Sequence, residues 1–103
     1  MNIGNAYLLV RSQVTDAGDR PKFDEWYRTH HLAFAADKLR AEKAWRFWSQ
    51  SDPAVHVALY QFKNLAHAME SMSSKELDIL LADFNQAWPN VARTREIMEL
   101  VQQ

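Results

Sequence analysis

Phe23-Asp24-Glu25-Trp26-Tyr27-Arg28-Thr29-His30-His31-Leu32 is the stretch that decides the fold and the candidate site. Within and just beyond it, large aromatic residues and one histidine recur at helical spacing, namely Phe23, Trp26, Tyr27, His30 and Phe34. The spacing predicts one amphipathic helix from about residue 21 to about residue 37, since Pro21 suits the first turn of a helix. Histidine titrates near neutral pH, so the adjacent pair His30 and His31 marks a candidate site for proton transfer.

Outward from this helix, strands and helices alternate. Strands are predicted over residues 6–14, 44–49, 55–62 and 91–101, where aliphatic, β-branched and aromatic residues are frequent. Asn64 is predicted to cap a short helix, and the pattern Ser73-Ser74-Lys75-Glu76 predicts a capping box that opens another helix. Pro89 would end that last helix. Its expected buried residues are Leu77, Leu80, Leu81, Phe84 and Trp88.

The order of these elements is strand, helix, strand, strand, helix pair, strand. This is the split βαβ, or ferredoxin-like, order, so we expect a single α+β domain over residues 1–103. Its four-stranded antiparallel sheet would carry the helices on one face. The strands are apolar on both faces, however, through Trp45, Trp48, Tyr60 and Phe62. A large uncovered apolar face is a partner surface, and we therefore predict a homodimer in which two sheets face each other.

Composition excludes several classes of function. The net charge is −1 and basic residues are scattered, which argues against a nucleic acid or an anionic membrane as partner. The absence of cysteine excludes thiolate metal sites and cysteine nucleophiles, and it fits a cytoplasmic location. With only Gly4 and Gly18, the chain has no dinucleotide-binding fingerprint, and its serines form no nucleophile elbow. No apolar run has the length of a signal peptide or of a membrane helix. We expect no cofactor.

The segment Trp26-Tyr27-Arg28-Thr29-His30-His31-Leu32-Ala33-Phe34 resembles the helix motif of EthD-like proteins in the dimeric α+β barrel superfamily. In that motif a Trp/Tyr pair precedes a histidine, which is followed by any residue, a proline and an aliphatic residue. On this match His31 is the motif histidine, while Ala33 replaces the proline, so the helix need not bend. The superfamily includes cofactor-free monooxygenases, isomerases and polyketide cyclases. The resemblance implies a homodimer that binds a hydrophobic, aromatic or polyketide-like small molecule.

The residues expected at the site are His31 as the catalytic acid/base and, as substrate-binding residues, Trp26, Tyr27, His30, Arg46, Trp48 and Tyr60. An acid/base histidine typically contributes about 10²–10⁴-fold in rate. His30 lies near the centre of the apolar stripe and is expected to be packed in the core, whereas His31 lies at the edge of the stripe and is expected to face a pocket. Because consecutive helical residues point about 100° apart, the two histidines should not share one ion, and no metal site is predicted.

Several alternatives stay open from the sequence alone. The strand arginines Arg11, Arg46, Arg93 and Arg95 are expected to pair with Glu96 or Glu99, either within the chain or across the dimer. Arg46 has the alternative of anchoring an acidic or phenolic ligand. The strand aromatics either fill the core or stack on a substrate, and Tyr60 could donate a hydrogen bond to an oxyanion.

Two functions are compatible with these residues. The first is a cofactor-independent enzyme, and the second is a non-catalytic homodimer that binds small molecules or serves as an accessory subunit. An open pocket of roughly 300 Å³ or more beside a histidine would favour the enzyme.

Overall fold

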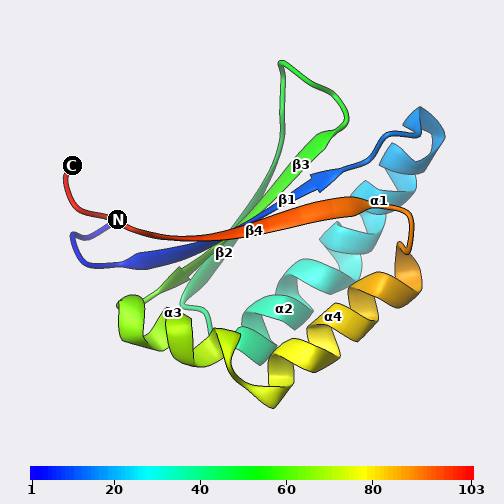
Figure 1. The fold of residues 1–103 in the computed structure, drawn as a ribbon. Coiled ribbons are helices and arrows are strands. Elements are labelled where there is room, and N and C mark those ends of the chain that lie inside the picture. The colour runs from blue at the N-terminus through cyan, green and yellow to red at the C-terminus, as the bar shows by residue number, and fades with distance from the viewer.

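The computed structural model describes all 103 residues, and the predicted order of elements is confirmed. In chain order the elements are β1 (Ala6–Gln13), a 3₁₀ turn (Ala17–Asp19), α1 (Arg20–Trp26), a π-helical turn (Tyr27–His31), α2 (Leu32–Leu39), β2 (Lys43–Trp48), β3 (Val55–Phe62), α3 (Leu65–Met72), α4 (Lys75–Ala87) and β4 (Ala92–Glu99) (Figure 1). The structure thus interrupts the predicted first helix with a π-helical turn. None of the helices is long and apolar enough to cross a membrane.

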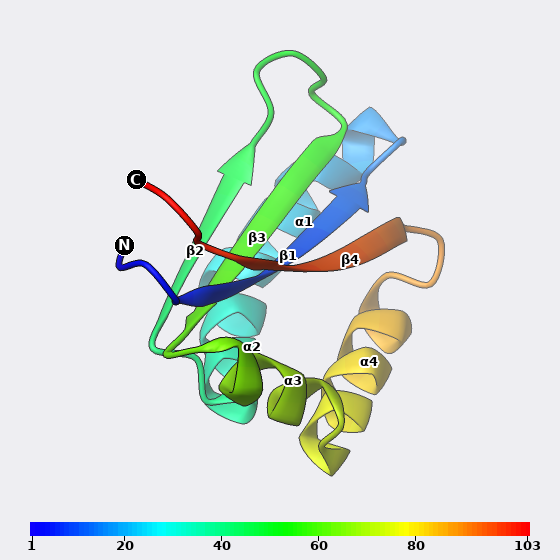
Figure 2. The same ribbon diagram turned by 60° about the vertical axis from the view of Figure 1, so that its left-hand side comes forward.

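The four strands form one antiparallel sheet in the order β2-β3-β1-β4, with β1 and β3 at its centre. The helices lie together on one side of the sheet, as the two views of the ribbon agree (Figures 1 and 2). The ferredoxin-like α+β fold is therefore confirmed. β4 is an edge strand that neighbours only β1, and α4 leads into it from the helical layer.

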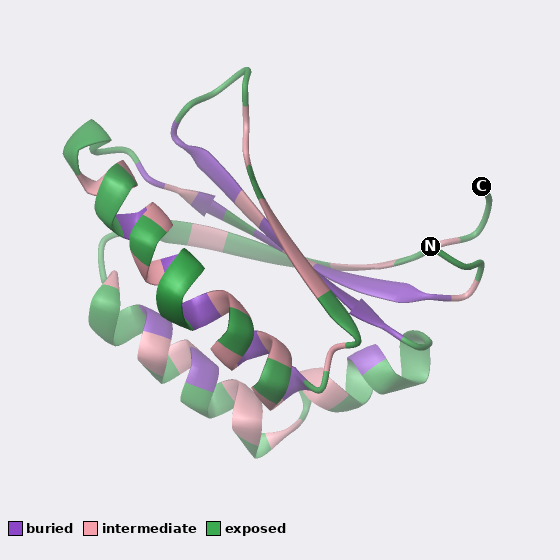
Figure 3. Ribbon diagram, turned by 180° about the vertical axis from the view of Figure 1, so that it is seen from behind, coloured by how far each residue is buried: buried purple, intermediate pink, exposed green.

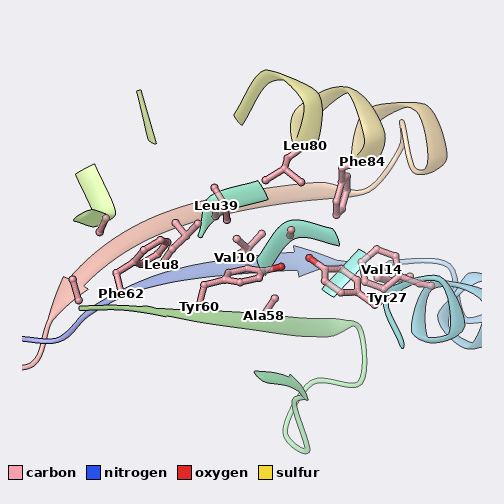
Figure 4. Close-up of a cluster of buried hydrophobic side chains, with 14 residues drawn as sticks. Leu8, Val10, Val14, Tyr27, Leu39, Ala58, Tyr60, Phe62, Leu80 and Phe84 are labelled. Carbon is pink, nitrogen blue, oxygen red and sulfur yellow. The ribbon is translucent and has the colours of Figure 1, made fainter. Parts of the chain in front are cut away.

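Alternation along the strands separates the two faces of the sheet. The side facing the helices contributes the strand residues of a buried apolar cluster, among them Leu8, Val10, Ala58, Tyr60 and Phe62 (Figure 4). Along the helices, buried positions alternate with exposed ones, as expected for a layer packed on one side only (Figure 3).

The opposite face of the sheet has no cover from the chain's own helices. A row of paired residues crosses it from Trp45 through Leu59 to Leu9. Phe47 is on the same face and is 52% exposed. Apolar surface of this kind on the helix-free face is what a partner would cover.

The join between α3 and α4 differs from the prediction. Asn64 caps α3 as expected, since its side chain accepts the His67 N–H at 2.9 Å. The predicted capping box at α4 is wrong, because Ser74 is the N-cap and makes no capping bond there. The hydroxyls of Ser73 and Ser74 instead donate to carbonyls in the last turn of α3, among them that of Ser71. With only two residues between the helices, the serines satisfy the free carbonyls of α3 rather than the free amides of α4.

Candidate functional site

The helix that carries the two histidines is not a regular α-helix. At the π-helical turn the N–H of Leu32 bonds to the carbonyl of Tyr27, five residues back. A local cause is Thr29, whose hydroxyl donates to the Glu25 carbonyl at 2.7 Å and so competes for an acceptor of the helix. Turns of this type occur mostly as single insertions in α-helices.

The π-helical turn changes which face of the helix is buried. The buried residues recur at every fourth position, namely Phe23, Tyr27, His31, Ala35 and Leu39. His31 therefore packs toward the sheet and is 5% exposed, whereas the side chain of His30 is 44% exposed. The prediction that His30 is the packed histidine is wrong, because it assumed an unbroken helical period through this segment.

His31 lies in an aromatic box. Its ring stacks on Trp26 at 4.3 Å between centroids, and it meets Tyr27 and Phe84 edge-on. Its Nδ1 is 2.8 Å from Oδ2 of Asp83 on α4. In the neutral imidazole, Nδ1–H donates to this carboxylate and Nε2 keeps its lone pair. Nε2 makes no hydrogen bond, and it is not completely buried. Another molecule can therefore reach it.

Asp83 also binds the second histidine, since His30 Nε2 lies 3.1 Å from both of its carboxylate oxygens. The two histidines were expected to diverge too far to ligate one ion easily, yet both rings reach the same carboxylate. His31 uses its near nitrogen and His30 its far nitrogen, which lets the two rings converge on one group. The ligand atoms of His30, His31 and Asp83 lie within 4.8 Å of one another and could hold a cation. The absence of a metal site stays a prediction.

The electrostatics prepare His31 as a base. Burial lowers the pKa of His31, and the hydrogen bond and charge of Asp83 offset this only in part. Burial alone would raise the pKa of the Asp83 carboxyl, but the hydrogen bonds with His31 and His30 outweigh it and lower the pKa. Near neutral pH the pair is thus a neutral imidazole oriented by an ionised carboxylate.

A small, mostly apolar cavity of about 40 Å³ lies beside His31, between α4 and the edge of the sheet. Its lining residues come from the helices and from β1, β3 and β4, and include Leu8, Val10, Tyr27, His31, Tyr60, Leu77, Leu80, Leu81, Phe84, Arg93 and Arg95. The hydroxyls of Tyr27 and Tyr60, which both line the cavity, point toward one another (Figure 4). The Tyr60 hydroxyl is buried without a hydrogen-bond partner. This cavity is well below the expected 300 Å³.

A larger hollow of about 320 Å³ lies at the far end of α2. It is lined mainly by polar and charged groups, among them Lys38, Arg40, His67, Glu70 and Glu76. None of the residues predicted for the site reaches it. Since ligand sites combine apolar walls with a few convergent polar groups, the cavity at His31 is the better candidate despite its smaller volume.

Two of the predicted binding residues lie elsewhere. Arg46 Nη1 and Trp48 Nε1 both donate to Oδ1 of Asp24 at 2.7 Å, in a cluster that includes the buried His56. Neither lines the cavity at His31. Of the alternatives for Arg46, the structure has the intramolecular ion pair, formed with Asp24 rather than with a glutamate of β4.

The other strand arginines do not form the predicted ion pairs within the chain, and pairing across a dimer stays a prediction. The salt bridges of the chain include none to Arg11, Arg93 or Arg95. On β4, alternation places Glu96 on the sheet face opposite to Arg93 and Arg95, whereas Glu99 shares their face but lies four residues beyond Arg95 on the extended strand.

The buried His56 makes stability depend on pH. Burial and then Arg46 lower its pKa from 6.5 to about 4. The folded state therefore prefers the neutral ring, so this contribution is complete above pH 6.5 and is lost as the pH falls toward about 4. We expect the free energy of unfolding to drop by about 3 kcal/mol over this range. Urea denaturation at a series of pH values measures it.

The matched control is His56→Gln, which keeps a polar side chain but cannot titrate. Its stability should fall less between these pH values, with the remaining slope coming from His31, whose pKa burial also lowers. An unchanged pH dependence in His56→Gln would contradict the assignment.

Comparison with known proteins places the fold. No family model matches the chain, and no curated protein is similar to it. Several solved structures match almost the whole length, among them the following three. A variant of SnoaB, a cofactor-independent oxygenase from Streptomyces nogalater, aligns with a TM-score of 0.71 at 10% identity, covering 97% of this chain and 96% of that one. An ethyl tert-butyl ether D (EthD) family protein from Bacillus halodurans gives 0.70 at 14% identity, covering 91% and 97%. A putative antibiotic biosynthesis monooxygenase from Nitrosomonas europaea gives 0.62 at 17% identity, covering 96% and 92%.

These similarities define the class of protein by its fold. The chain has the ferredoxin-like α+β fold of these structures, and the resemblance to EthD-like proteins is confirmed at the level of the fold. At such low identity the likeness carries the fold and not the chemistry, which has to be argued from the site.

Proposed function

We propose that the protein is a small cofactor-independent enzyme that moves a proton on a hydrophobic, aromatic or polyketide-like small molecule. The observation that carries this proposal is the pair of His31 and Asp83 at an apolar cavity, with His31 Nε2 unbonded. The fold shared with a cofactor-independent oxygenase supports it. The reducing cytoplasm is the proposed location, since the chain has no cysteines to protect or to bridge.

The chemistry that the residues support is proton abstraction beside a carbonyl. Nε2 of His31 takes the proton, and the electron pair of the C–H bond moves to the carbonyl oxygen to form an enolate. Asp83 stabilises the imidazolium through Nδ1–H. Burial and the neighbouring Tyr27 raise the pKa of Tyr60, so its hydroxyl keeps its proton and can donate to the enolate oxygen. His31 then returns the proton to the same or another carbon.

Admission of such a ligand requires α4 to move. A cavity that holds benzene measures about 150 Å³, and the present one has about 40 Å³. α4 supplies Leu80, Leu81 and Phe84 to the wall next to the edge strand β4. Displacement of α4 from β4 would widen the cavity without breaking a strand pair.

In this proposal the residues predicted for the site have different roles. Tyr27 and Tyr60 contact the ligand, Trp26 backs the ring of His31, and His30 lies at the rim. Arg46 and Trp48, which bond to Asp24, are not needed for it.

The alternative is a non-catalytic homodimer that binds small molecules or serves as an accessory subunit. One observation favours it, namely the cavity of about 40 Å³, which is far below the size expected of an open active site. In this alternative the aromatic side chains around His31 only pack the core, and Asp83 only accepts hydrogen bonds from the two histidines.

The two functions differ in hydrogen exchange. We would incubate the protein in D₂O with 2-tetralone, an aromatic ketone with acidic CH₂ protons, and follow its proton signals by NMR. The enzyme is expected to raise the exchange rate above that of buffer in proportion to protein concentration. Saturation transfer from protein to 2-tetralone without faster exchange would instead support the binding protein.

We also propose that the helix-free face of the sheet forms a homodimer. Sedimentation at micromolar concentration should give about twice the chain mass of 12.0 kDa. Phe47→Glu should shift the protein toward monomer, because it places a charge on this face. Leu65→Glu, at an exposed position on α3, is the matched control and should stay dimeric. A wild-type protein that sediments only as a 12.0 kDa species would refute the dimer.

A further inference from the structure

We infer that Arg93 and Arg95 form an anion-binding subsite at the edge of the cavity, and that the ligand is a hydrophobic carboxylic acid. This inference deepens the proposed function and rests on it in one respect, because it takes the cavity beside His31 as the ligand site. It adds the charge of the ligand, which the pair of His31 and Asp83 does not specify.

The register of the sheet places both arginines on the correct face. Arg93 pairs with Ser12 and Arg95 with Val10, and side chains at these positions point toward the helices. β4 is the edge strand, so the two guanidinium groups flank the side of the cavity that opens between β4 and α4. Both contribute to the lining of the cavity.

The guanidinium groups have no anionic partner in the chain. Neither forms a salt bridge or a side-chain hydrogen bond, whereas Arg46 on the same sheet face is paired with Asp24. Arg93 lies over the ring of Phe84, with Cζ 3.9 Å from the ring centroid. Such stacking fixes the plane of the guanidinium and leaves its edge N–H groups free for a planar acceptor such as a carboxylate.

The polar groups of the cavity include two guanidinium groups, which can only donate, and two tyrosine hydroxyls, which can donate or accept. The Tyr60 hydroxyl is 1% exposed and unpartnered, and it lines the same cavity as the arginines. His31, which also lines the cavity, adds Nε2 as an acceptor. Burial and the neighbouring Arg95 also lower the pKa of Arg93, so the paired cations carry an electrostatic cost that a bound anion would relieve.

The rest of the cavity determines the body of the ligand. Its walls are aliphatic and aromatic, with Leu77, Leu80 and Phe84 from α4 and Leu8 from β1. An apolar body among these side chains with a carboxylate against the arginines would satisfy both parts of the cavity. Arg-carboxylate pairs are frequently bidentate, which gives orientation as well as affinity.

A matched pair of ligands tests the charge. Isothermal titration would compare 2-naphthoate with 2-naphthamide, which has the same ring and no charge. We expect the wild-type protein to bind naphthoate about tenfold or more tightly than the amide near neutral pH, as charge-assisted hydrogen bonds imply. Arg93→Gln should remove most of this preference, and Arg93→Lys should retain part of it. Arg11→Gln, on the opposite face of the sheet, should leave it unchanged.

Equal affinities for the two ligands, no binding of naphthoate, or an unchanged preference in a folded Arg93→Gln protein would overturn the inference. Should Arg93→Gln fail to fold by thermal melting, Arg95→Gln gives the same test, since Arg95 is exposed. The titration measures binding and needs no turnover, so it tests the subsite even if the protein is not an enzyme. Preference for naphthoate in a protein that does not exchange 2-tetralone would retain the subsite and refute the catalysis.

Discussion

Replacement of His31 by alanine should lower the protein-catalysed exchange of 2-tetralone by about 10²–10⁴-fold, the usual contribution of a positioned acid/base group. His31 is the one histidine of the cavity, and its Nε2 is free to accept a proton. The rate should be flat near neutral pH and should fall in acid, because the active form is the neutral ring and burial lowers the pKa of His31. Proton NMR across a pH series measures both.

The matched control is His30→Ala, which removes the other histidine bound to Asp83. Its rate should stay within a few-fold of wild type, since His30 lies at the exposed rim. Asp83→Asn should slow exchange, because the Nδ1–H of His31 loses its charged acceptor. If His30→Ala were inactive and His31→Ala active, the assignment of the base would be reversed.

Phe23→Ala should cost about 3–5 kcal/mol of folding free energy, as for other fully buried aromatics. Phe23 is 0% exposed and lies at the centre of an aromatic cluster. Its ring is 5.3 Å from both Tyr27 and Trp88, and 5.2 Å from His56, between centroids. Since small domains have about 5–15 kcal/mol of total stability, urea denaturation should show a large loss of midpoint or an unfolded protein.

Trp88→Ala provides the comparison within the same cluster. From sequence alone Trp88 is the buried anchor at the end of α4, but the structure leaves it half-buried with an unpartnered Nε1. Its removal deletes less buried surface and one unsatisfied polar group, so we expect a smaller loss of stability than for Phe23→Ala. A larger loss for Trp88→Ala would show that the end of α4, rather than Phe23, is the centre of the core.

The architecture was predictable because it depends on local periodicity. The aliphatic, β-branched and aromatic residues at 55–62 favour a strand, and the aromatic spacing that starts at Phe23 favours a helix. The order of the elements then leaves few topologies. His31, which the resemblance rather than the helical stripe placed at a pocket, does line the cavity, and its catalytic role stays a prediction. The stripe pointed to His30 because it assumed a regular helix. The π-helical turn inserts one residue, which changes the phase of the positions that follow it.

The sequence by itself therefore determined the elements, their order and the region of the site. Only the tertiary structure decided the chemistry of that region. Asp83 is 52 residues from His31 in the chain and meets it through the packing of α4 on the helical layer. The lack of ion pairs at Arg93 and Arg95, and the stacking of Arg93 on Phe84 of α4, likewise appear only in the folded chain. Contacts of this kind depend on how distant segments pack in three dimensions, which spacing along one chain does not encode.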